Sequence, residues 1–358
     1  MPLQESDVFE ALRGVEDPDL KKDLVSLGMV QQVAIDGDHV TTTIELTTPA
    51  CPMKDRIKAD ITAAIAGAAT TRGLAEQTVD VVFTAAATPE RDVLPGVRHV
   101  IAVGAGKGGV GKSTISTLLA IGLSRLGATC GLLDGDIYGP SLGTMLGLDD
   151  LDAMAEGNTL VPFPAHGIKS MTIGKLVDPD KPMIWRGPMA HKAFSQLLLQ
   201  TDWGTLDYLI VDLPPGTGDV PLSLAQAMPL SGAVIVGTPQ RVALEDARRA
   251  VRMFGELGVP VLGLVENMSW FIADDGREYD LFGRGGGEAM ASDMGLPFLG
   301  PMPMHIEMRK HADAGTPLAN FEICSEITDA IEHMSGELAR RVSMSAAQAP
   351  TQPTISVS

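Results

Sequence analysis

The sequence predicts an α/β fold in which a mostly parallel, doubly wound sheet follows a small α+β domain. From residue 98 on, short aliphatic runs alternate with segments of helical spacing, and uninterrupted apolar strands are typical of a parallel sheet covered on both faces. Aromatic residues make up only 4% of the chain, while glycine contributes 39 residues, as expected where many strands turn into helices. The predicted strands of this sheet are residues 99–103, 129–133, 208–211, 232–236 and 261–265.

The α+β domain is assigned to residues 1–84. Its first helix has Ser6 as a suitable N-cap, because a serine hydroxyl can accept a hydrogen bond from an amide of the first turn. Two of its strands flank Asp36-Gly37-Asp38, which is a favourable hairpin turn. The expected elements are helices at 6–14 and 52–66 and strands at 30–35, 40–46 and 79–84.

Two further segments lack the pattern of a packed element. Residues 85–97 contain two prolines and little periodicity, which predicts a linker between the domains. The second domain then covers residues 98–342. Residues 343–358 are mostly small or polar and contain almost no core-forming side chains, so we expect a disordered tail.

The net charge of −18 limits the kinds of partner. A chain this acidic is poorly suited to binding nucleic acid or an anionic membrane without specificity. The first residues are not a basic segment followed by an apolar one, and the chain has three cysteines. No apolar run approaches the roughly 18 residues that cross a bilayer. We therefore expect a cytoplasmic protein that binds neither nucleic acid nor membrane.

The strongest functional motif is Gly106-Lys-Gly-Gly-Val-Gly-Lys-Ser113, which fits the Walker A pattern between a predicted strand and a helix. Small residues let consecutive backbone amides face the phosphates, and the helix N-terminus adds a partial positive charge. Lys112 is expected to reach the β and γ phosphates of ATP, and the Ser113 hydroxyl to bind Mg²⁺. The expected nucleotide-binding residues here are Gly106, Lys107, Gly108, Gly109, Val110, Gly111, Lys112, Ser113 and Thr114.

Three aspartates at predicted strand ends complete a candidate ATPase. Asp134 and Asp136 follow the second strand, and Asp212 ends a hydrophobic strand in the Walker B manner. Open α/β sheets bind ligands at the carboxyl ends of their strands. We expect Asp134 and Asp212 to lie near Mg²⁺, mostly through waters, and Asp136 to orient the attacking water. The segments after Asp136 and after Asp212 are expected to respond to the γ phosphate.

The second lysine of the loop, Lys107, gives a K-G-G-x-G-K-S pattern that resembles the deviant Walker A of the SIMIBI class of P-loop ATPases. The resemblance implies that Lys107 reaches the nucleotide of a partner subunit, and hence that the active ATPase is a homodimer. A cation supplied by a partner stabilises the charge on the transferring phosphoryl group.

Further motifs resemble the Mrp/ApbC-type iron–sulfur cluster carriers and extend from residue 94 to about 338. These motifs are Leu133-Asp-Gly-Asp-Ile-Tyr-Gly-Pro-Ser141, Trp185-Arg-Gly-Pro-Met189, Val211-Asp-Leu-Pro-Pro-Gly-Thr-Gly-Asp219, Thr238-Pro-Gln240, Asn267-Met-Ser269 and Phe282-Gly-Arg-Gly-Gly-Gly287. The resemblance implies ATP hydrolysis coupled to transfer of a cluster, such as [4Fe–4S], to recipient apoproteins. It also implies that Asn267, expected at a strand end, bonds the adenine.

The N-terminal domain resembles a cluster-assembly domain. The resemblance lies in Val15-Glu-Asp-Pro-Asp19, Leu24-Val-Ser-Leu-Gly-Met29 and Thr47-Thr-Pro-Ala-Cys-Pro52. It implies that Cys51 contacts metal or cluster. A lone cysteine is also often a small buried hydrophobe, but a place near a helix N-terminus would favour the thiolate.

One departure from the family leaves the function open between two classes. Many carriers have a Cys-x-x-Cys after the Asn-Met-Ser motif, whereas this chain has Ala273, Asp274 and Asp275 there. Carboxylates are poor substitutes for thiolates around a cluster. Cys130 is expected in the core and Cys324 in a structural position. The first hypothesis is an ATP-dependent cluster carrier; the second is an ATP-gated adaptor of the MinD/ParA type that carries no cluster. A small-molecule kinase is less favoured, because no arginine-rich lid segment is apparent.

Overall fold

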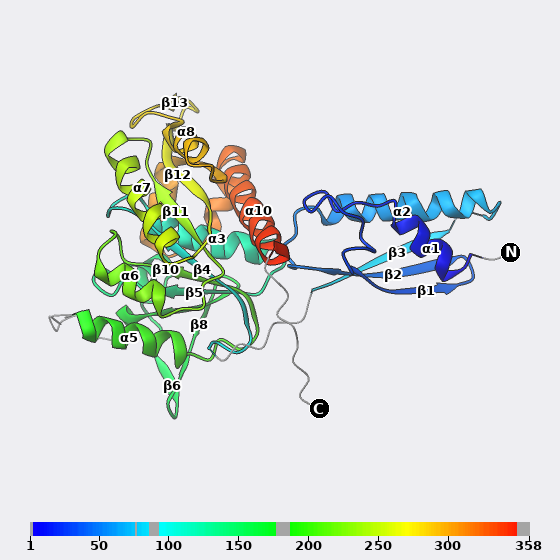
Figure 1. Cartoon of the computed structure of the whole chain (residues 1–358). Helices are drawn as coiled ribbons and strands as arrows, with labels where there is room; N and C mark the ends of the chain where they lie inside the picture. The colour runs from blue at the N-terminus through cyan, green and yellow to red at the C-terminus, as the bar shows by residue number, and fades with distance from the viewer. Residues whose placement is uncertain (1–2, 76, 86–92, 177–186, 349–358) are drawn as a thin grey trace. The chain divides into compact units, whose positions relative to one another are not determined.

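The computed structural model describes residues 3–75, 77–85, 93–176 and 187–348 (Figure 1). The chain divides into two compact units, residues 1–87 with 339–358 and residues 88–338. The middle of the expected linker, the start of the Trp185-Arg-Gly-Pro-Met189 motif and residues 349–358 lie outside the described residues.

The N-terminal unit is a three-stranded sheet with two helices on one face (Figure 1). Its strands follow the order β1-β2-β3, with β1 antiparallel and β3 parallel to β2. Alternate residues of β2 are buried, and α2 presents Ile57, Ile61 and Ile65 at a spacing of four, so the strand and helix patterns meet in one core. The elements are α1 (Glu5–Leu12), β1 (Val30–Asp36), β2 (His39–Leu46), α2 (Lys54–Thr71) and β3 (Thr78–Ala85).

The second unit is built on a mostly parallel sheet, which confirms the predicted fold class. Within the described residues the sheet has nine strands in the order β13-β12-β11-β4-β10-β5-β9-β8, with β14 beside β12. Of the strands that the structure describes in this sheet, only β8 and β13 pair antiparallel. Every residue of β4, β5, β10 and β11 is buried, as the uninterrupted apolar runs predicted. The strands are β4 (Val97–Gly104), β5 (Cys130–Asp134), β8 (Phe163–Ala165), β9 (Ile168–Thr172), β10 (Leu206–Asp212), β11 (Gly232–Gly237), β12 (Val261–Ile272), β13 (Glu278–Tyr279) and β14 (Phe298–His305).

Helices connect the strands of this sheet (Figure 1). The helices are α3 (Lys112–Arg125), α4 (Leu142–Met145), α5 (Gly187–Leu199), α6 (Asp219–Gln226), α7 (Arg241–Glu256), α8 (Gly286–Asp293), α9 (Ile306–Ala314) and α10 (Ser325–Gln348), with 3-10 helices η1 (Ile173–Lys175) and η2 (Pro317–Glu322). A separate hairpin consists of β6 (Met154–Glu156) and β7 (Thr159–Val161). No helix in the described ranges is long and apolar enough to cross a membrane.

The predicted start of the disordered tail was wrong. Residues 343–348 continue α10, which ends at Gln348. Their composition lacks large core residues, but it includes methionine, alanine and glutamine, which have high helix propensity. A helix that is already formed extends at little cost through such residues, because only the first turn is expensive to nucleate.

The register of the sheet sets up the candidate site. Asp212 at the end of β10 pairs with Val103 of β4 on one side and with Asp134 of β5 on the other. Asp134 pairs in turn with Thr172 of β9. Because these strands are parallel, their carboxyl ends share one edge, and the two aspartates become neighbours beside the loop that follows β4.

The loop after β4 packs closely on α7 at Gly106. A Cβ atom on Gly106 would lie 2.1 Å from the carbonyl carbon of Asp246 and 2.7 Å from the backbone nitrogen of Ala247. We expect Gly106→Ala to lower the free energy of unfolding by about 1–3 kcal/mol, since helix backbone must move to admit the methyl group. Thermal unfolding without nucleotide measures the effect.

Gly108→Ala is the matched control. A Cβ there would meet only the Pro215 side chain, at 3.8 Å, which is ordinary contact. Equal melting temperatures for the two variants would contradict the close approach of Gly106 to α7.

Candidate functional site

The loop between β4 and α3 has the geometry of an anion cradle. Gly109 and Gly111 have φ values of 79° and 80°, in the left-handed region that favours glycine. Gly111 is also the N-cap of α3, so Lys112 and Ser113 are the first two residues of the helix. The N-terminus of a 14-residue helix therefore faces the loop, where its unpaired amides and partial positive charge attract an anion.

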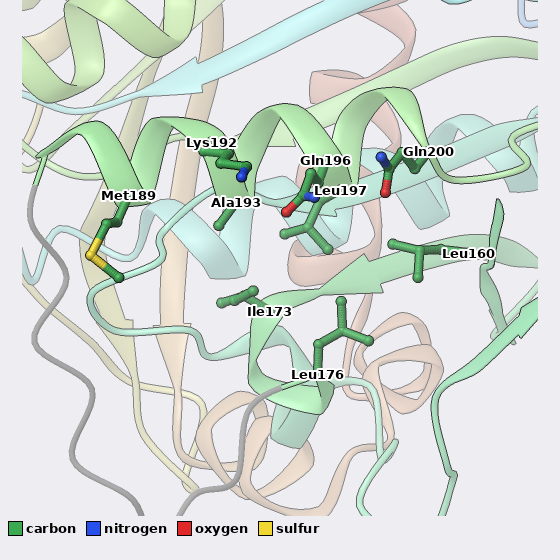
Figure 2. Close-up of a pocket in the computed structure, with 9 residues that line it drawn as sticks. All are labelled: Leu160, Ile173, Leu176, Met189, Lys192, Ala193, Gln196, Leu197 and Gln200. Carbon is green, nitrogen blue, oxygen red and sulfur yellow. The ribbon is translucent and has the colours of Figure 1, made fainter. Parts of the chain in front are cut away.

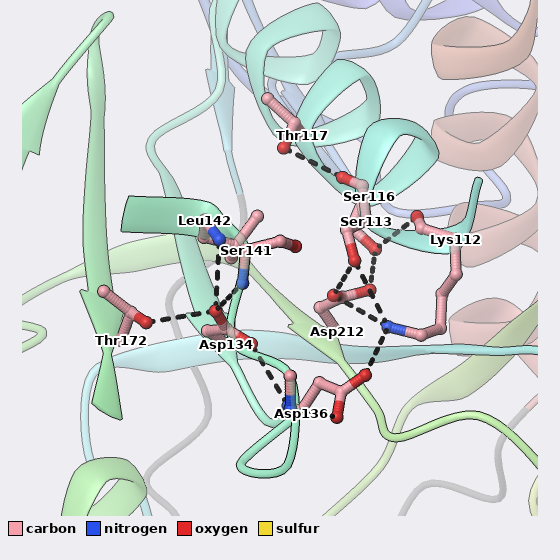
Figure 3. Close-up of polar contacts among 11 residues, drawn as sticks. Lys112, Ser113, Ser116, Thr117, Asp134, Asp136, Ser141, Leu142, Thr172 and Asp212 are labelled. Carbon is pink, nitrogen blue, oxygen red and sulfur yellow. Dashed lines mark hydrogen bonds and ion pairs between the residues drawn. The ribbon is translucent and has the colours of Figure 1, made fainter. Parts of the chain in front are cut away.

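A buried ion pair ties the helix start to the end of β10 (Figure 3). The Nζ of Lys112 lies 2.8 Å from Oδ2 of Asp212, and the two side chains are 7% and 0% exposed. The Ser113 hydroxyl donates to the same Oδ2 at 2.6 Å, and Ser116 donates to Oδ1 at 2.7 Å. The Walker A and Walker B residues expected from the sequence are thus in direct contact.

Asp136 faces the same lysine. Its Oδ2 lies 4.0 Å from Nζ of Lys112, and its side chain is partly buried. Burial raises the pKa of Asp136; the Lys112 charge acts in the opposite direction. A carboxylate in this place can accept a hydrogen bond from a group bound beside the lysine.

Asp134 is more deeply placed than the sequence indicated. Its side chain is fully buried, and its two oxygens accept hydrogen bonds from the backbone of Asp136, Ser141 and Leu142 and from the Thr172 hydroxyl (Figure 3). Burial raises the pKa of Asp134 to about 7, and the neighbouring charge of Asp212 adds to this effect. The expected site near Mg²⁺ therefore includes a carboxylate already bonded to four protein donors.

A hollow of about 260 Å³ opens beside Lys112 and Asp136. The predicted residues that line it include Lys107, Lys112, Ser113 and Asp136, which come from the loop, α3 and the segment after β5. The fold therefore brings together residues from three separate parts of the sequence, because Pro215 follows β10 and also lines the hollow. Its remaining lining residues are Gly108, Gly109, Gly111, Thr114, Ser141, Met145 and Pro215.

A larger hollow, of about 470 Å³, lies between α5, η1 and β7 (Figure 2). Figure 2 shows Ile173 and Leu176 facing Ala193 and Leu197 across it. Within the part of the chain that the structure describes, the lining contains one lysine and two glutamines but no acid, histidine or cysteine. This hollow is the larger of the two, but the smaller one is lined by the lysines, the serine and the glycine-rich backbone that suit a phosphate group. We therefore place the candidate site at the loop.

Asn267 differs from its expected position at a strand end. It lies within β12, where the pairing with β14 shifts between Asn267 and Phe271 and Met268 adopts a φ of 58°. Its Nδ2 donates to the Val110 carbonyl at 2.8 Å and would lie 2.1 Å from a Cβ atom on Gly111. The sequence placed the strand end too early, because Glu266, Asn267 and Ser269 are polar although all three are buried within the strand.

Cys51 belongs to the N-terminal unit, in the turn before α2, where it packs against the hydrophobic core. The expectation that this position favours the thiolate was wrong: burial raises the pKa of Cys51, and Asp17 and Asp19 add to the shift. Cys130 is buried in β5, as expected, and burial also raises the pKa values of Cys130 and Cys324. Among the described residues, no group of three or more His, Cys, Asp or Glu side chains has metal-binding geometry.

Sequence reasoning missed Glu266, a buried carboxylate beside Asn267. It accepts hydrogen bonds from the backbone of Gly285 and Gly287 and from the Ser269 hydroxyl. It thereby caps α8 and fixes the glycine-rich segment before that helix. A glutamate directly after an apolar strand run was the available signal, but only the fold shows that it points inward.

Comparisons with known proteins agree across both units. The family model described as NUBPL iron-transfer P-loop NTPase matches residues 96–339, and the model of the iron–sulfur cluster assembly protein matches residues 5–97. An iron–sulfur cluster carrier protein of Synechocystis sp. is 47% identical over 95% of this chain and 98% of its own length. A carrier protein of Deinococcus radiodurans is 46% identical over 94% and 95%, respectively.

Two solved structures match the second unit's fold. A nucleotide-binding protein from Archaeoglobus fulgidus in complex with ADP has a TM-score of 0.56 and 36% identity, and covers 62% of this chain and 88% of its own. The cell division ATPase MinD from Pyrococcus furiosus has a TM-score of 0.51 at 18% identity, covering 68% and 98%. The second likeness concerns the fold alone.

The raised pKa of Cys51 predicts slow alkylation. At pH 8, the folded protein should react with iodoacetamide at Cys51 more slowly than free N-acetylcysteine does, because less thiolate is present. Peptide mass spectrometry over a pH series gives the rate at each cysteine. Cys130 should react only after unfolding, since it is 3% exposed.

The urea-unfolded protein is the control, in which the three cysteines should react at similar rates. Alkylation of folded Cys51 that is faster than that of the free thiol at pH 7 would show an activated thiolate instead.

Proposed function

Because the chain belongs to the family of NUBPL-type iron-transfer P-loop NTPases, we propose that it hydrolyses ATP and carries iron–sulfur clusters to recipient apoproteins. The observation that carries the ATPase part is the convergence of Lys112, Ser113 and Asp212 at the N-terminus of α3. Charged groups placed in advance around a phosphate site supply most of the catalysis of phosphoryl transfer.

The residues around the loop suit Mg²⁺-bound ATP. The Ser113 hydroxyl and the Asp212 carboxylate are hard oxygen donors that are already side by side, as Mg²⁺ requires. When bound, Mg²⁺ neutralises charge on the β and γ phosphates. Lys112 binds the same phosphates, and the backbone from Gly106 to Thr114 surrounds them.

Two further residues have proposed roles around the nucleotide. Asp136, beside Lys112, orients the attacking water. For Asn267 the proposed contact is with the adenine, through Oδ1 or the second hydrogen of Nδ2, because one hydrogen of Nδ2 bonds the Val110 carbonyl.

Lys107 is proposed to act on the nucleotide of a partner subunit in a homodimer. Its side chain lines the hollow at the loop without being one of the groups that bind Asp212. A lysine in this place adds a cation to the site when two copies face each other, which increases turnover more than binding. We propose a cytoplasmic location for this dimer.

The cluster is the proposed cargo, and Cys51 is its candidate ligand. The relatives named as carriers align with both units, including the segment around Cys51. The β12–β13 hairpin, where the thiolates of a Cys-x-x-Cys would lie, has Asp275 bonded to Arg277 instead. One Cys51 from each subunit supplies two thiolates, so a [4Fe–4S] cluster needs further ligands from a recipient or donor protein.

The alternative function, a MinD/ParA-type adaptor without a cluster, has weaker support. The likeness to MinD is at the level of the fold, at 18% identity. The carriers share 46–47% identity, and a cluster-assembly domain precedes the ATPase domain.

Substitution of the two loop lysines separates binding from turnover. We expect Lys112→Ala to lower the affinity for ATP at least tenfold, because it removes the buried cation that binds the phosphates in the proposed site. Lys107→Ala should keep ATP affinity within about twofold and lower kcat. Isothermal titration and a phosphate-release assay measure both effects.

Thermal unfolding of each variant controls for damage to the fold, since Lys112→Ala leaves Asp212 buried without its partner. Wild-type affinity in a folded Lys112→Ala protein would rule out the phosphate site. Full turnover with Lys107→Ala would rule out the role across the dimer.

Anaerobic reconstitution with iron and sulfide tests the cargo. We expect a cluster in the parent protein and its loss in Cys51→Ser, measured as iron and sulfide per dimer and as visible absorption. Cys324→Ser is the matched control, because it removes another half-buried thiol that we assign no ligand role. Absence of a cluster from the parent protein would favour the adaptor.

A further inference from the structure

The segment after β5 is held by one carboxylate at both of its ends. Asp134 Oδ1 accepts the Asp136 amide at 3.1 Å, and Oδ2 accepts the amides of Ser141 and Leu142, each at 3.2 Å. The segment therefore leaves Asp134 and returns to it, with Asp136 inside the closed loop (Figure 3). We call residues 136–142 the acidic loop.

The fourth donor to Asp134 comes from another strand. Thr172 ends β9 and pairs in register with Asp134 of β5, and its hydroxyl lies 3.0 Å from Oδ2. The same hydroxyl oxygen accepts the Gly174 amide at 3.2 Å. Because a hydroxyl has a single hydrogen, the bond from Gly174 leaves that hydrogen for Asp134. Thr172 is 1% exposed, so water does not compete for it.

This arrangement connects Thr172 to the candidate catalytic carboxylate. Asp134 and Thr172 are both buried, whereas Asp136 reaches the hollow and lies 4.0 Å from Lys112. A change at Thr172 therefore reaches Asp136 through Asp134 and the acidic loop. It leaves the direct contacts of Asp212 with Lys112, Ser113 and Ser116 in place.

We propose that Thr172 is a positioning residue for ATP hydrolysis, and that Asp134 serves as the anchor of the acidic loop in place of the contact with Mg²⁺ that the sequence suggested. This inference rests on the proposed ATPase activity. Thr172 fixes the direction of the Asp134 carboxylate, and Asp134 fixes the backbone from which Asp136 projects. Neither residue touches the nucleotide, so their effect belongs to turnover and not to binding.

Thr172→Val and Thr172→Ser test the inference together. Valine keeps the shape but leaves Asp134 without one buried donor, and serine keeps the donor. We expect Thr172→Val to lower kcat for ATP hydrolysis about tenfold, with KM for ATP and Kd for ADP within about twofold. Thr172→Ser should recover most of the parent kcat.

Ser170→Ala is the matched control. Ser170 lies on the same strand, is equally buried and donates to the Phe163 carbonyl, away from Asp134. Its variant should keep the parent kcat. An unchanged kcat in Thr172→Val, or an equal loss in Ser170→Ala, would overturn the inference. If Thr172→Val does not fold, Thr172→Cys takes its place. Because a thiol is a weak hydrogen-bond donor, we expect its kcat to be measurable but lower than that of Thr172→Ser.

Hydrogen exchange separates this inference from the proposed ATPase activity. In the protein without added nucleotide, peptides that cover the acidic loop should exchange faster in Thr172→Val than in the parent, and at the parent rate in Thr172→Ser. Unchanged exchange in Thr172→Val would contradict the anchoring role. A parent protein with no ATP hydrolysis would instead refute the proposed function, and with it the catalytic purpose of the anchor.

Discussion

The contact between Lys112 and Asp212 is the interaction on which the site depends. Both side chains are buried, and the lysine lies 2.8 Å from the carboxylate. Removing one partner of such a pair costs on the order of 3–5 kcal/mol, because the other charge stays buried. The pair therefore fixes the start of α3 against the end of β10. Ser113 and Ser116 strengthen the attachment by satisfying both carboxylate oxygens.

The register of the sheet places further polar residues beside Asp212 on the neighbouring strands. Asp212, Asp134 and Thr172 form a row across three neighbouring strands, and all three side chains are buried. Asp212 and Asp134 accept hydrogen bonds from protein donors, whereas Asp136, two residues beyond Asp134, lines the hollow. Burial thus separates the two aspartates that are bonded within the protein from the one that lines the hollow.

The proposed cluster ligand and the proposed nucleotide-binding residues belong to different units of the chain. The proposed nucleotide-binding residues lie within residues 88–338, whereas Cys51 belongs to the N-terminal unit and has a pKa raised by burial. Cluster iron would offset that burial effect, since a coordinated thiol is deprotonated by the metal.

The sequence by itself determined the parallel sheet, the phosphate loop and the three aspartates. Each of these depends on local pattern: apolar runs, glycine spacing and a charge at a strand end. Only the tertiary structure decided that Asp134 is enclosed by four donors, that Asn267 lies within β12, and that Cys51 packs on a core. These outcomes depend on register and burial, which arise when distant segments pack, and no local pattern encodes them.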